Sequence, residues 1–526
     1  MTTPAREGAR DRGLVLLLVL LALPILVYGM ASHGVSTSDE AYYHGVAEHM
    51  VESGDWFHVV FRGAHRPFDA FMNAPLQYWS RAGLISVFGS SYYTMRALSA
   101  LFAIASLLVT VRLVRSLSDR HTALLAGVIQ LTTFQLVYMH SGRTGVLEPV
   151  VMFLVTLAAL SFIRVLETGR GLVLHHVCLV LLLNVKAPTV ALPVLAELAC
   201  FALIPRSRPQ LRRWLVLGLA VAPIGLLWHA VNVVVLWEQL PGVLELMGQH
   251  AGDTGREGFF ARRGSNLVYY ATALLFGAFP YSLMYPFAMS AALWGDAGGG
   301  APKRDGWRVL GLYVAAIVVF FVFIDKRYHW YVIPAIPFLS AFVALWLRNL
   351  AMGPPSRLAL AMLSLVLGAV AAIDVRMREL NPFDPLFDLY VVSGRGGSML
   401  EMRSWALFAA VSIGAFIVLW LVSSRVGARA ARPLAWSVMA LVVGVGAARV
   451  LAPLDKVDFV TPAEALRREI DLARETGREL DYPLRVPRGR ANALGSRFYF
   501  ADDFRLVQDG AGYLIYPKEP EGEPVP

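Results

Sequence analysis

Charged residues are scarce in this chain: Asp, Glu, Lys and Arg make up 16% of its 526 residues, whereas 56% are hydrophobic. Such a composition excludes a water-soluble globule and indicates a membrane protein. Cysteine is nearly absent as well. Cys178 and Cys200 both lie in apolar runs without Cys-x-x-Cys spacing, which excludes a disulfide framework and a zinc cluster of cysteines. No nucleic-acid-binding motif accompanies the net charge of +9, so we expect no nucleic-acid partner.

Long apolar runs recur from end to end, and a membrane-spanning helix needs about 20 such residues. The first run lacks a small-residue cleavage site, so we expect a retained helix. The sequence therefore predicts an all-α polytopic membrane protein. We count about thirteen spans, near 14–31, 95–114, 122–139, 147–166, 172–184, 188–204, 214–237, 267–293, 308–324, 331–347, 357–373, 405–422 and 434–451.

Arginines predict the orientation, because Lys and Arg concentrate in the cytoplasmic loops. Arg6, Arg10 and Arg12 precede the first span, and the arginines of the later short loops fall on the same side. We expect a cytoplasmic N-terminus, and an odd number of spans then puts the C-terminus outside. Residues 1–451 would form the membrane domain. Residues 452–526 would form a small outer α/β domain, with a helix from Thr461, three strands and a disordered tail.

The first outer loop, at about 32–94, carries an acidic pair, Asp39 and Glu40. Thr37 and Glu40 have the spacing of a capping box, which predicts a helix that ends at Gly54. A second surface helix is predicted from Pro75 to Gly89. The two carboxylates would lie at the membrane surface, where one can accept a proton from a substrate hydroxyl. The alternative is that Asp39 only complements the helix dipole.

Three further outer segments carry ionisable or aromatic residues. Each segment can also be explained by structure alone. Arg143 and Glu148 can form a pair that holds their hairpin together, and Lys186 can extend only as far as the lipid headgroups. The tyrosines of the last segment can belong to an aromatic belt at the membrane interface. As a set, the cations can neutralise a departing phosphate and the aromatic residues can line a substrate pocket. The segments contribute Arg143 and Glu148; Lys186; and Lys326, Arg327, Tyr328, His329 and Tyr331.

The order of these motifs resembles that of the GT-C glycosyltransferases, in the branch of the protein mannosyltransferases and the lipid A aminoarabinose transferase. The resemblance spans the chain. It rests on Asp39-Glu40, on Ser53-Gly54-Asp55-Trp56, on the segment from Ala74 to Trp79, on Arg143 to Pro149 and on Lys326 to Tyr331.

The resemblance implies an enzyme of the bacterial cytoplasmic (inner) membrane. It would transfer a sugar from a polyprenyl-phosphate donor to a lipid, glycan or protein acceptor on the periplasmic side, usually with inversion, among membrane lipids. The family places its first acidic residue at the reaction centre, which corresponds to Asp39 as general base with Glu40 in support. We expect the donor phosphate to be bound by Lys326, Arg327, Arg143 and Lys186. Tyr42, Tyr43, Tyr328, His329, Tyr331 and Glu148 would line the pocket.

The sequence also departs from the family. Asn73-Ala74-Pro75 stands where relatives carry lysine and an acidic residue before the second surface helix, and Tyr42 stands where the aminoarabinose transferase has an arginine. We expect no resident cofactor or metal. A divalent ion on Glu40, His44 and Glu48, spaced at i, i+4 and i+8, is the alternative, although one straight helix spreads three ligands too far apart. The rival functions are a transporter of lipid-linked glycans or small solutes, and an inactive scaffold.

Overall fold

The structure is a computed structural model. It describes residues 4–31, 38–61, 63–73, 75–138, 140–251, 259–294, 300–324 and 327–352, and beyond 352 only short pieces such as 440–448, 484–487, 504–509 and 512–517. Predictions for the spans at 357–373 and 405–422 therefore lie largely outside the described residues.

Helices dominate the described chain. In order they are α1 (Pro4–Val27), α2 (Ser38–Ser53), α3 (Pro67–Met72), α4 (Leu76–Phe88), α5 (Tyr92–Leu117), α6 (Arg120–Leu131), α7 (Phe134–Val137), α8 (Glu148–Thr168), α9 (Leu172–Leu183), η1 (Ala187–Val190), α10 (Ala191–Leu203), η2 (Pro205–Gln210), α11 (Leu211–Val235), η3 (Trp237–Gln239), α12 (Leu240–Ala251), α13 (Phe259–Gly277), η4 (Tyr281–Met284), α14 (Tyr285–Trp294), α15 (Gly300–Val322), η5 (His329–Ala335) and α16 (Ile336–Met352). The strands are β1 (Val60–Phe61), β2 (Ala64–His65), β3 (Leu484–Pro487), β4 (Phe504–Asp509) and β5 (Gly512–Pro517).

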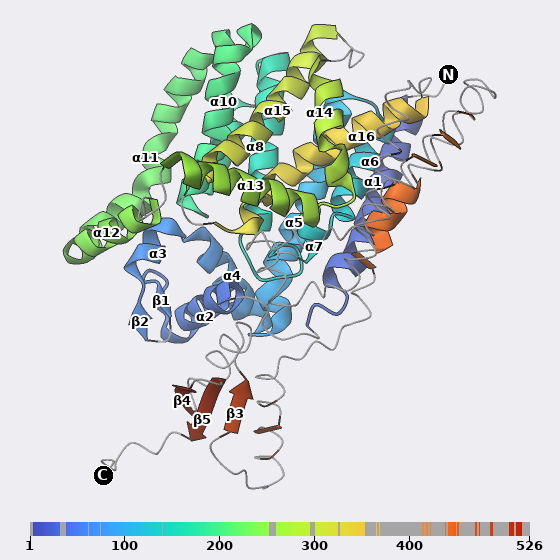
Figure 1. Cartoon of the computed structure of the whole chain (residues 1–526). Coiled ribbons are helices and arrows are strands. Elements are labelled where there is room, and N and C mark those ends of the chain that lie inside the picture. The colour runs from blue at the N-terminus through green and yellow to red at the C-terminus, as the bar shows by residue number, and fades with distance from the viewer. Residues whose placement is uncertain are drawn as a thin grey trace, which may run out of the picture.

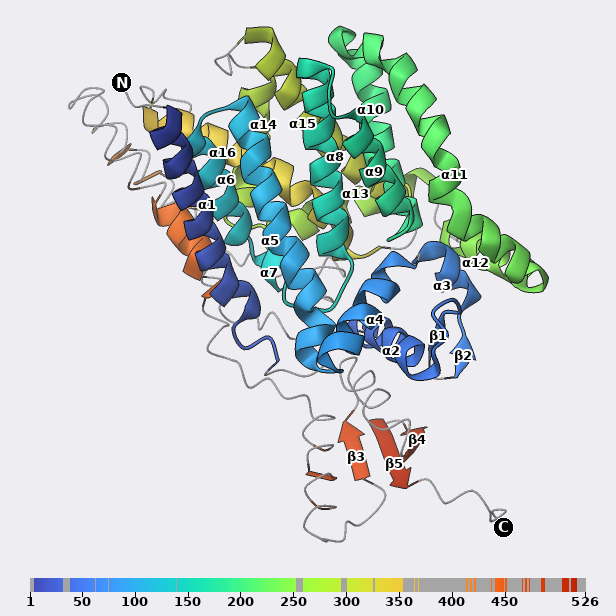
Figure 2. The same ribbon diagram turned by 180° about the vertical axis from the view of Figure 1, so that it is seen from behind.

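The long helices pack into a bundle, and a layer made of α2, α3, α4, β1 and β2 lies across one end of it (Figures 1 and 2). Within the described residues, five stretches are long and apolar enough to cross a membrane. They are Tyr92–Leu117, Glu148–Thr168, Pro205–Val235, Lys303–Val322 and His329–Leu350. The expectation of a polytopic helical membrane protein is therefore confirmed, whereas the count of thirteen spans stays a prediction.

Two predicted spans are divided in the structure. The run 122–139 is split into α6 and α7. The run 267–293 reads as a single apolar stretch, but the structure divides it into α13 and α14, with η4 between them. Pro280 lies at the break, where a proline without an N–H group cannot continue the hydrogen-bond ladder of α13. The sequence reasoning also missed α12, an amphipathic segment that projects from the side of the bundle (Figure 1).

Both predicted surface helices are confirmed as α2 and α4. Gly54 and Gly89 follow their last residues with φ of 75° and 76°, a conformation that glycine adopts without steric cost. Two of the hydrogen bonds that fasten the layer to the bundle involve backbone groups of α3 and α4. The N–H of Leu76 donates to the Asn184 carbonyl at 3.1 Å, and the Trp228 indole donates to the Ala70 carbonyl at 2.8 Å.

Near the C-terminus, β4 and β5 confirm the strands expected at 504–508 and 512–516, and they pair antiparallel. β3, which was not predicted, completes a sheet of order β3-β5-β4. The expected strand at 496–501 and most of the helix from Thr461 lie outside the described residues. The division into two domains at residue 451 stays a prediction.

A buried ion pair joins the surface layer to the bundle. Glu40 of α2 and Arg96 of α5 are both fully buried, and Arg96 Nε lies 2.6 Å from Glu40 Oε1. The same carboxylate accepts the N–H of Gly145 at 2.8 Å, and Arg96 also donates to the carbonyl of Met30 after α1. One charge pair therefore ties together α1, α2, α5 and the loop before α8.

Removing one partner of this pair should destabilise the protein, because the other charge is then left buried and uncompensated. We expect Arg96→Leu to lower the free energy of unfolding by about 3–5 kcal/mol. The double variant Glu40→Gln/Arg96→Leu should recover a large part of that loss. Thermal unfolding of purified protein in detergent measures both, and equal midpoints for the single and double variants would contradict the pairing.

Candidate active site

Side chains from five segments meet at the end of the bundle beneath the surface layer. α2 contributes Asp39, the loop between α7 and α8 contributes His140, α8 begins with Glu148, and Lys186 precedes η1. Trp330 of η5 closes the group. We call these five residues the Asp39 cluster. They are far apart in the sequence, and only the packing of α2 on the bundle brings them together.

His140 lies between two carboxylates. Its Nε2 is 3.3 Å from Asp39 Oδ2 and 3.6 Å from Glu148 Oε2. Neither ring nitrogen of His140 has a hydrogen-bond partner among the described residues, and the same holds for Glu148 Oε2. His140 also has φ of 56°, the one positive value at a non-glycine residue that the described chain shows. Histidine adopts this conformation more readily than most residues, and such outliers concentrate at functional sites.

Glu148 is neutralised by Lys186. The Nζ atom donates to Glu148 Oε1 at 3.0 Å, and it lies 5.0 Å from the ring centroid of Tyr331 in a cation–π contact. This ring stacks in turn on Phe321 at 4.7 Å. Snorkelling to the headgroups therefore does not account for the position of Lys186, because its ammonium is paired with the buried carboxylate of Glu148.

An aromatic stack fixes the imidazole. His140 stacks on Trp330 with centroids 3.9 Å apart, and Trp330 stacks on Tyr328 at 4.4 Å. A planar contact on one ring face leaves the edge of the imidazole directed at the carboxylates. The aromatic residues of this segment thus do more than mark a membrane interface.

Exposure separates the two carboxylates. The Asp39 side chain is 38% exposed, whereas Glu148 is 5% exposed and His140 3%. Asp39 is therefore the carboxylate that a substrate hydroxyl can reach, while Glu148 is buried and paired with Lys186. Of the two, Asp39 is suited to accept a proton.

Two tyrosines and a further aspartate surround Asp39. Tyr42 donates from its hydroxyl to Asp69 Oδ2 at 2.6 Å. Burial raises the pKa of Tyr43 well above its ordinary value, and the carboxylates of Asp39 and Glu148 act in the same direction. Burial also raises the pKa of Asp69, with a smaller contribution from Asp39, against hydrogen bonds from Tyr42 and Asn73. The wall of the site thus consists of phenol and amide groups and of Asp69, whose two oxygens accept from Tyr42 and Asn73.

Several residues predicted for the site do not join the Asp39 cluster. Glu40 is occupied by Arg96 and Gly145, so we give it a structural role in place of support for the base. Arg143 donates to the Ile25 carbonyl at 2.7 Å and packs on Tyr138, so the Arg143–Glu148 pair is absent from the described structure. Burial lowers the pKa of Arg143.

The segment from Lys326 to Tyr331 contributes only some of its predicted residues to the Asp39 cluster. Arg327 Nη1 donates to Ser265 Oγ at 2.8 Å, and His329 accepts from Gln135 through its backbone carbonyl at 2.9 Å. Lys326 lies outside the described residues. Tyr328 and Tyr331 reach the cluster through Trp330 and Lys186, respectively.

Sequence reasoning missed His140, Trp330 and Asp69. His140 opens the same hairpin as Arg143 and Glu148, and its proximity to two ionisable residues near a span was a signal. Trp330 matched the pattern of an aromatic residue at the membrane interface, which gave no reason to assign it to the site. Asp69 gave no signal, because its partner Tyr42 is 27 residues away.

The metal alternative involves residues that the protein uses otherwise. Glu40 is held by Arg96, while His44 and Glu48 contact each other at 3.4 Å and both bond Ser90. Within the described residues, no group of three His, Cys, Asp or Glu side chains has the geometry to hold an ion. That the reaction needs no metal stays a prediction.

Known proteins resemble this chain in sequence and fold. Residues 14–206 match the family model for dolichyl-phosphate-mannose-protein mannosyltransferase. The undecaprenyl phosphate-alpha-4-amino-4-deoxy-L-arabinose arabinosyl transferase 1 of Pseudomonas fluorescens is 26% identical over 428 residues, which cover 78% of this chain and 75% of that protein.

Solved structures of glycosyltransferases also resemble this chain in fold. ArnT from Cupriavidus metallidurans, bound to undecaprenyl phosphate, aligns with a TM-score of 0.61 and 20% identity over 93% of this chain and 84% of its own. Arabinosyltransferase EmbB from Mycobacterium smegmatis aligns with a TM-score of 0.52 and 16% identity over 93% of this chain and 46% of its own. The chain therefore has the fold of these proteins, which is the GT-C fold that the sequence predicts.

Proposed function

We propose that this protein is a membrane glycosyltransferase that moves a sugar from a polyprenyl-phosphate donor to an acceptor hydroxyl or amine. The observation that carries the proposal is the Asp39 cluster, in which one accessible carboxylate lies beside a buried imidazole, carboxylate and lysine at the end of the bundle. The transferases named by the comparisons support the donor class. They do not favour the transporter alternative.

The reaction follows from the position of Asp39. As the acceptor oxygen attacks the anomeric carbon, Asp39 takes the acceptor proton. The bond between the anomeric carbon and the phosphate oxygen breaks, and that oxygen leaves with the electron pair as polyprenyl phosphate. Attack from the face opposite the phosphate inverts the anomeric centre. The proton on Asp39 then passes to solvent or to the released phosphate.

His140 acts as a positioning residue for this base. Carboxylates only accept hydrogen bonds, so a proton on Nε2 serves either Asp39 or Glu148. Nε2 lies nearer to Asp39 Oδ2, at 3.3 Å, than to Glu148 Oε2, at 3.6 Å, so we assign its proton to a hydrogen bond that orients Asp39 during the reaction. The stack on Trp330 holds the ring in that position.

Cations at the same end would bind the donor phosphate. Arg327 is outside the Asp39 cluster but on the loop that leads to Trp330, and its guanidinium is bonded to a single serine hydroxyl in the described structure. A guanidinium presents several donors in one plane, so it can hold a phosphate while keeping that contact. Lys326 would add positive charge, and Lys186, whose side chain is 19% exposed, would contribute while it keeps its contact with Glu148.

The proposal extends to the setting of the reaction. Arginines at the opposite end of the bundle favour the periplasmic side of a bacterial cytoplasmic membrane for the site. The acceptor is a lipid, glycan or protein there. Asn73 donates to Asp69 at 3.1 Å, which places an amide where relatives have a charged residue and supports a reaction without a resident metal.

Asp39→Asn should abolish transfer while leaving the fold intact, because it removes the proton acceptor with almost no change in shape. A general base contributes about 10²–10⁴-fold to turnover. Purified protein, incubated with a panel of polyprenyl-phosphate sugars and an acceptor extract, is assayed for release of free polyprenyl phosphate. Glu52→Gln, at the exposed end of α2, is the matched control. Wild-type turnover by Asp39→Asn would exclude it as the base.

His140→Asn should lower kcat about tenfold or more with little change in the donor KM, because only the orientation of Asp39 is lost. The estimate corresponds to one hydrogen bond to a charged group, about 1.5–3 kcal/mol. Asparagine tolerates the positive φ at this position, and His49→Asn on α2 is the control. A rise in KM at constant kcat would instead assign His140 to donor binding.

Arg327→Ala should weaken use of the donor about 10–150-fold in kcat/KM, since a charge-assisted contact to phosphate is lost. Arg327→Lys should recover part of the activity, because it keeps the charge without the planar pair of donors. Arg308→Ala, at the exposed start of α15, is the control. If Arg327→Ala impaired the acceptor KM alone, the residue would belong to the acceptor side of the site.

A further inference from the structure

A second acidic residue, Asp69, lies close to the proposed base. Tyr42 follows Asp39 by three residues in α2, so the two side chains lie on one face of that helix. The Tyr42 hydroxyl donates to Asp69 Oδ2 at 2.6 Å, and Asn73 Nδ2 donates to Asp69 Oδ1 at 3.1 Å. Burial raises the pKa of Asp69, and the Asp39 carboxylate acts in the same direction, so the two carboxylates lie within electrostatic range. We call Tyr42, Asp69 and Asn73 the Asp69 group.

Packing fixes the Asp69 group from both sides. The Tyr42 ring makes edge contacts with Phe61 and Tyr43, at centroid distances of 4.9 and 5.8 Å. The helix that carries Asp69, α3, is anchored by the Trp228 indole, which donates to the carbonyl of Ala70 at 2.8 Å. The polar atoms of the group therefore have their positions before a substrate binds, which lowers the entropic cost of binding.

Asp69 determines the hydrogen-bonding chemistry of its two partners. A carboxylate only accepts hydrogen bonds, so Tyr42 gives it the single proton of its hydroxyl and Asn73 turns its amide nitrogen toward it. The Tyr42 oxygen can then only accept a bond from a ligand, and Oδ1 of Asn73 is turned away from Asp69 as a second acceptor. All three side chains are half-buried, so each keeps some exposed surface. Acceptors beside the base select a ligand that presents hydrogen-bond donors.

The Asp69 group also lies near a segment that we assign to the donor phosphate. α3 packs on η1, and η1 begins directly after Lys186. In the proposed reaction, the anomeric carbon lies between the phosphate and the acceptor oxygen, which is next to Asp39. The sugar ring that contains this carbon is therefore near both segments, where α2 and α3 present the Asp69 group.

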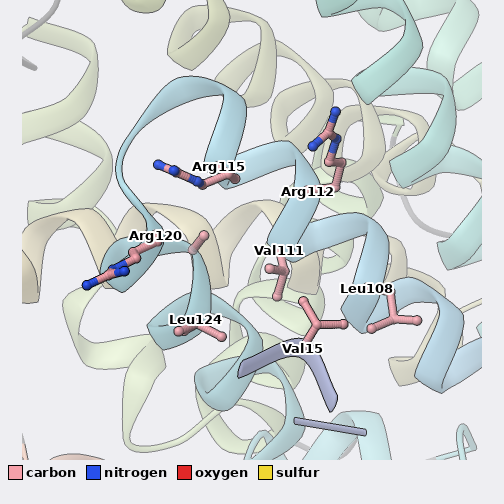
Figure 3. Close-up of a pocket in the computed structure, with 8 residues that line it drawn as sticks. Val15, Leu108, Val111, Arg112, Arg115, Arg120 and Leu124 are labelled. Atoms are coloured by element: carbon pink, nitrogen blue, oxygen red, sulfur yellow. The ribbon is translucent and has the colours of Figure 1, made fainter. Parts of the chain in front are cut away.

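The cavity between α1, α5 and α6 is too far from the base to hold this sugar. It is lined by arginines from the last turns of α5 and the start of α6, with apolar side chains between them (Figure 3). Arg112 of this cavity is 16 residues from Arg96 in α5, which is about 24 Å at 1.5 Å per residue. Arg96 in turn contacts Glu40, the neighbour of Asp39. A sugar in that cavity would lie a bundle length away from the reaction.

We propose that the Asp69 group binds a ring hydroxyl of the transferred sugar and thereby determines which sugar the enzyme uses. The sugar hydroxyl donates to the Tyr42 oxygen, and Tyr42 donates to Asp69. Bonds in such a chain strengthen one another, so the carboxylate makes the tyrosine a better acceptor. The inference rests on the proposed function, since it requires that a sugar is delivered to Asp39.

The test uses the full-length enzyme and the polyprenyl-phosphate sugar that it transfers fastest. Analogues of that donor carry fluorine in place of one hydroxyl at a time, because fluorine cannot donate a hydrogen bond. Release of polyprenyl phosphate gives kcat/KM for the wild type and for Tyr42→Phe with each donor. Comparing the two enzymes on the same donor cancels the effect of fluorine on the chemical step.

We expect Tyr42→Phe to lower kcat/KM for the unmodified donor about tenfold, the equivalent of one hydrogen bond. With one fluorinated donor the two enzymes should be equal, because the contact is already lost. Asp69→Asn should show the same dependence on that hydroxyl, since an amide can donate to the Tyr42 oxygen and no longer fixes its proton. Tyr93→Phe, at the exposed start of α5, is the control and should match the wild type with every donor.

The outcomes separate this inference from the proposed function. An equal loss in Tyr42→Phe with every fluorinated donor would give the Tyr42–Asp69 bond a structural role only and would overturn the inference. Wild-type kinetics of Tyr42→Phe, or a change confined to the acceptor KM, would overturn it as well. In each of these cases the enzyme still transfers a sugar and the proposed function stands. Failure of the wild type to release polyprenyl phosphate from any sugar donor would overturn both.

Discussion

The buried pair of Glu40 and Arg96 is the constraint on which the candidate site depends. Glu40 follows Asp39 directly in α2, and its carboxylate also receives the N–H of Gly145, three residues before Glu148. Fixing Glu40 therefore fixes Asp39 against the loop that carries His140 and Glu148. A Cβ at Gly145 would lie 2.6 Å from the Met95 carbonyl, so this close approach requires glycine. Two buried charges in membrane surroundings are costly unless paired, and here the pair also sets the geometry of the site.

Three carboxylates near α2 have three different environments. Glu40 is fully buried against an arginine, Glu148 is buried against a lysine, and Asp39 is partly exposed beside an imidazole. Burial and pairing remove the first two from contact with a substrate. The difference in solvent access, rather than in residue type, is the reason that we propose Asp39 as the base.

The two ends of the bundle carry opposite chemistry. The end under α2 and α4 gathers carboxylates, an imidazole and stacked aromatic rings, whereas the end near α6 gathers arginines over an apolar floor. The fold supplies the scaffold for the candidate site, whose chemistry depends on the side chains placed at the end under α2 and α4.

The sequence by itself determined the class of the protein, because apolar runs and helix-end signals are local. Gly54, Pro75 and Gly89 predicted the limits of α2 and α4, and the order of motifs around Asp39 indicated the superfamily. The partners of each charge were decided only by the tertiary structure. Glu40 and Asp39 are adjacent in the chain, yet helix geometry directs one toward Arg96, 56 residues away, and the other toward His140. The break between α13 and α14 and the pairing of Glu148 with Lys186 likewise depend on contacts between distant segments, which no local pattern records.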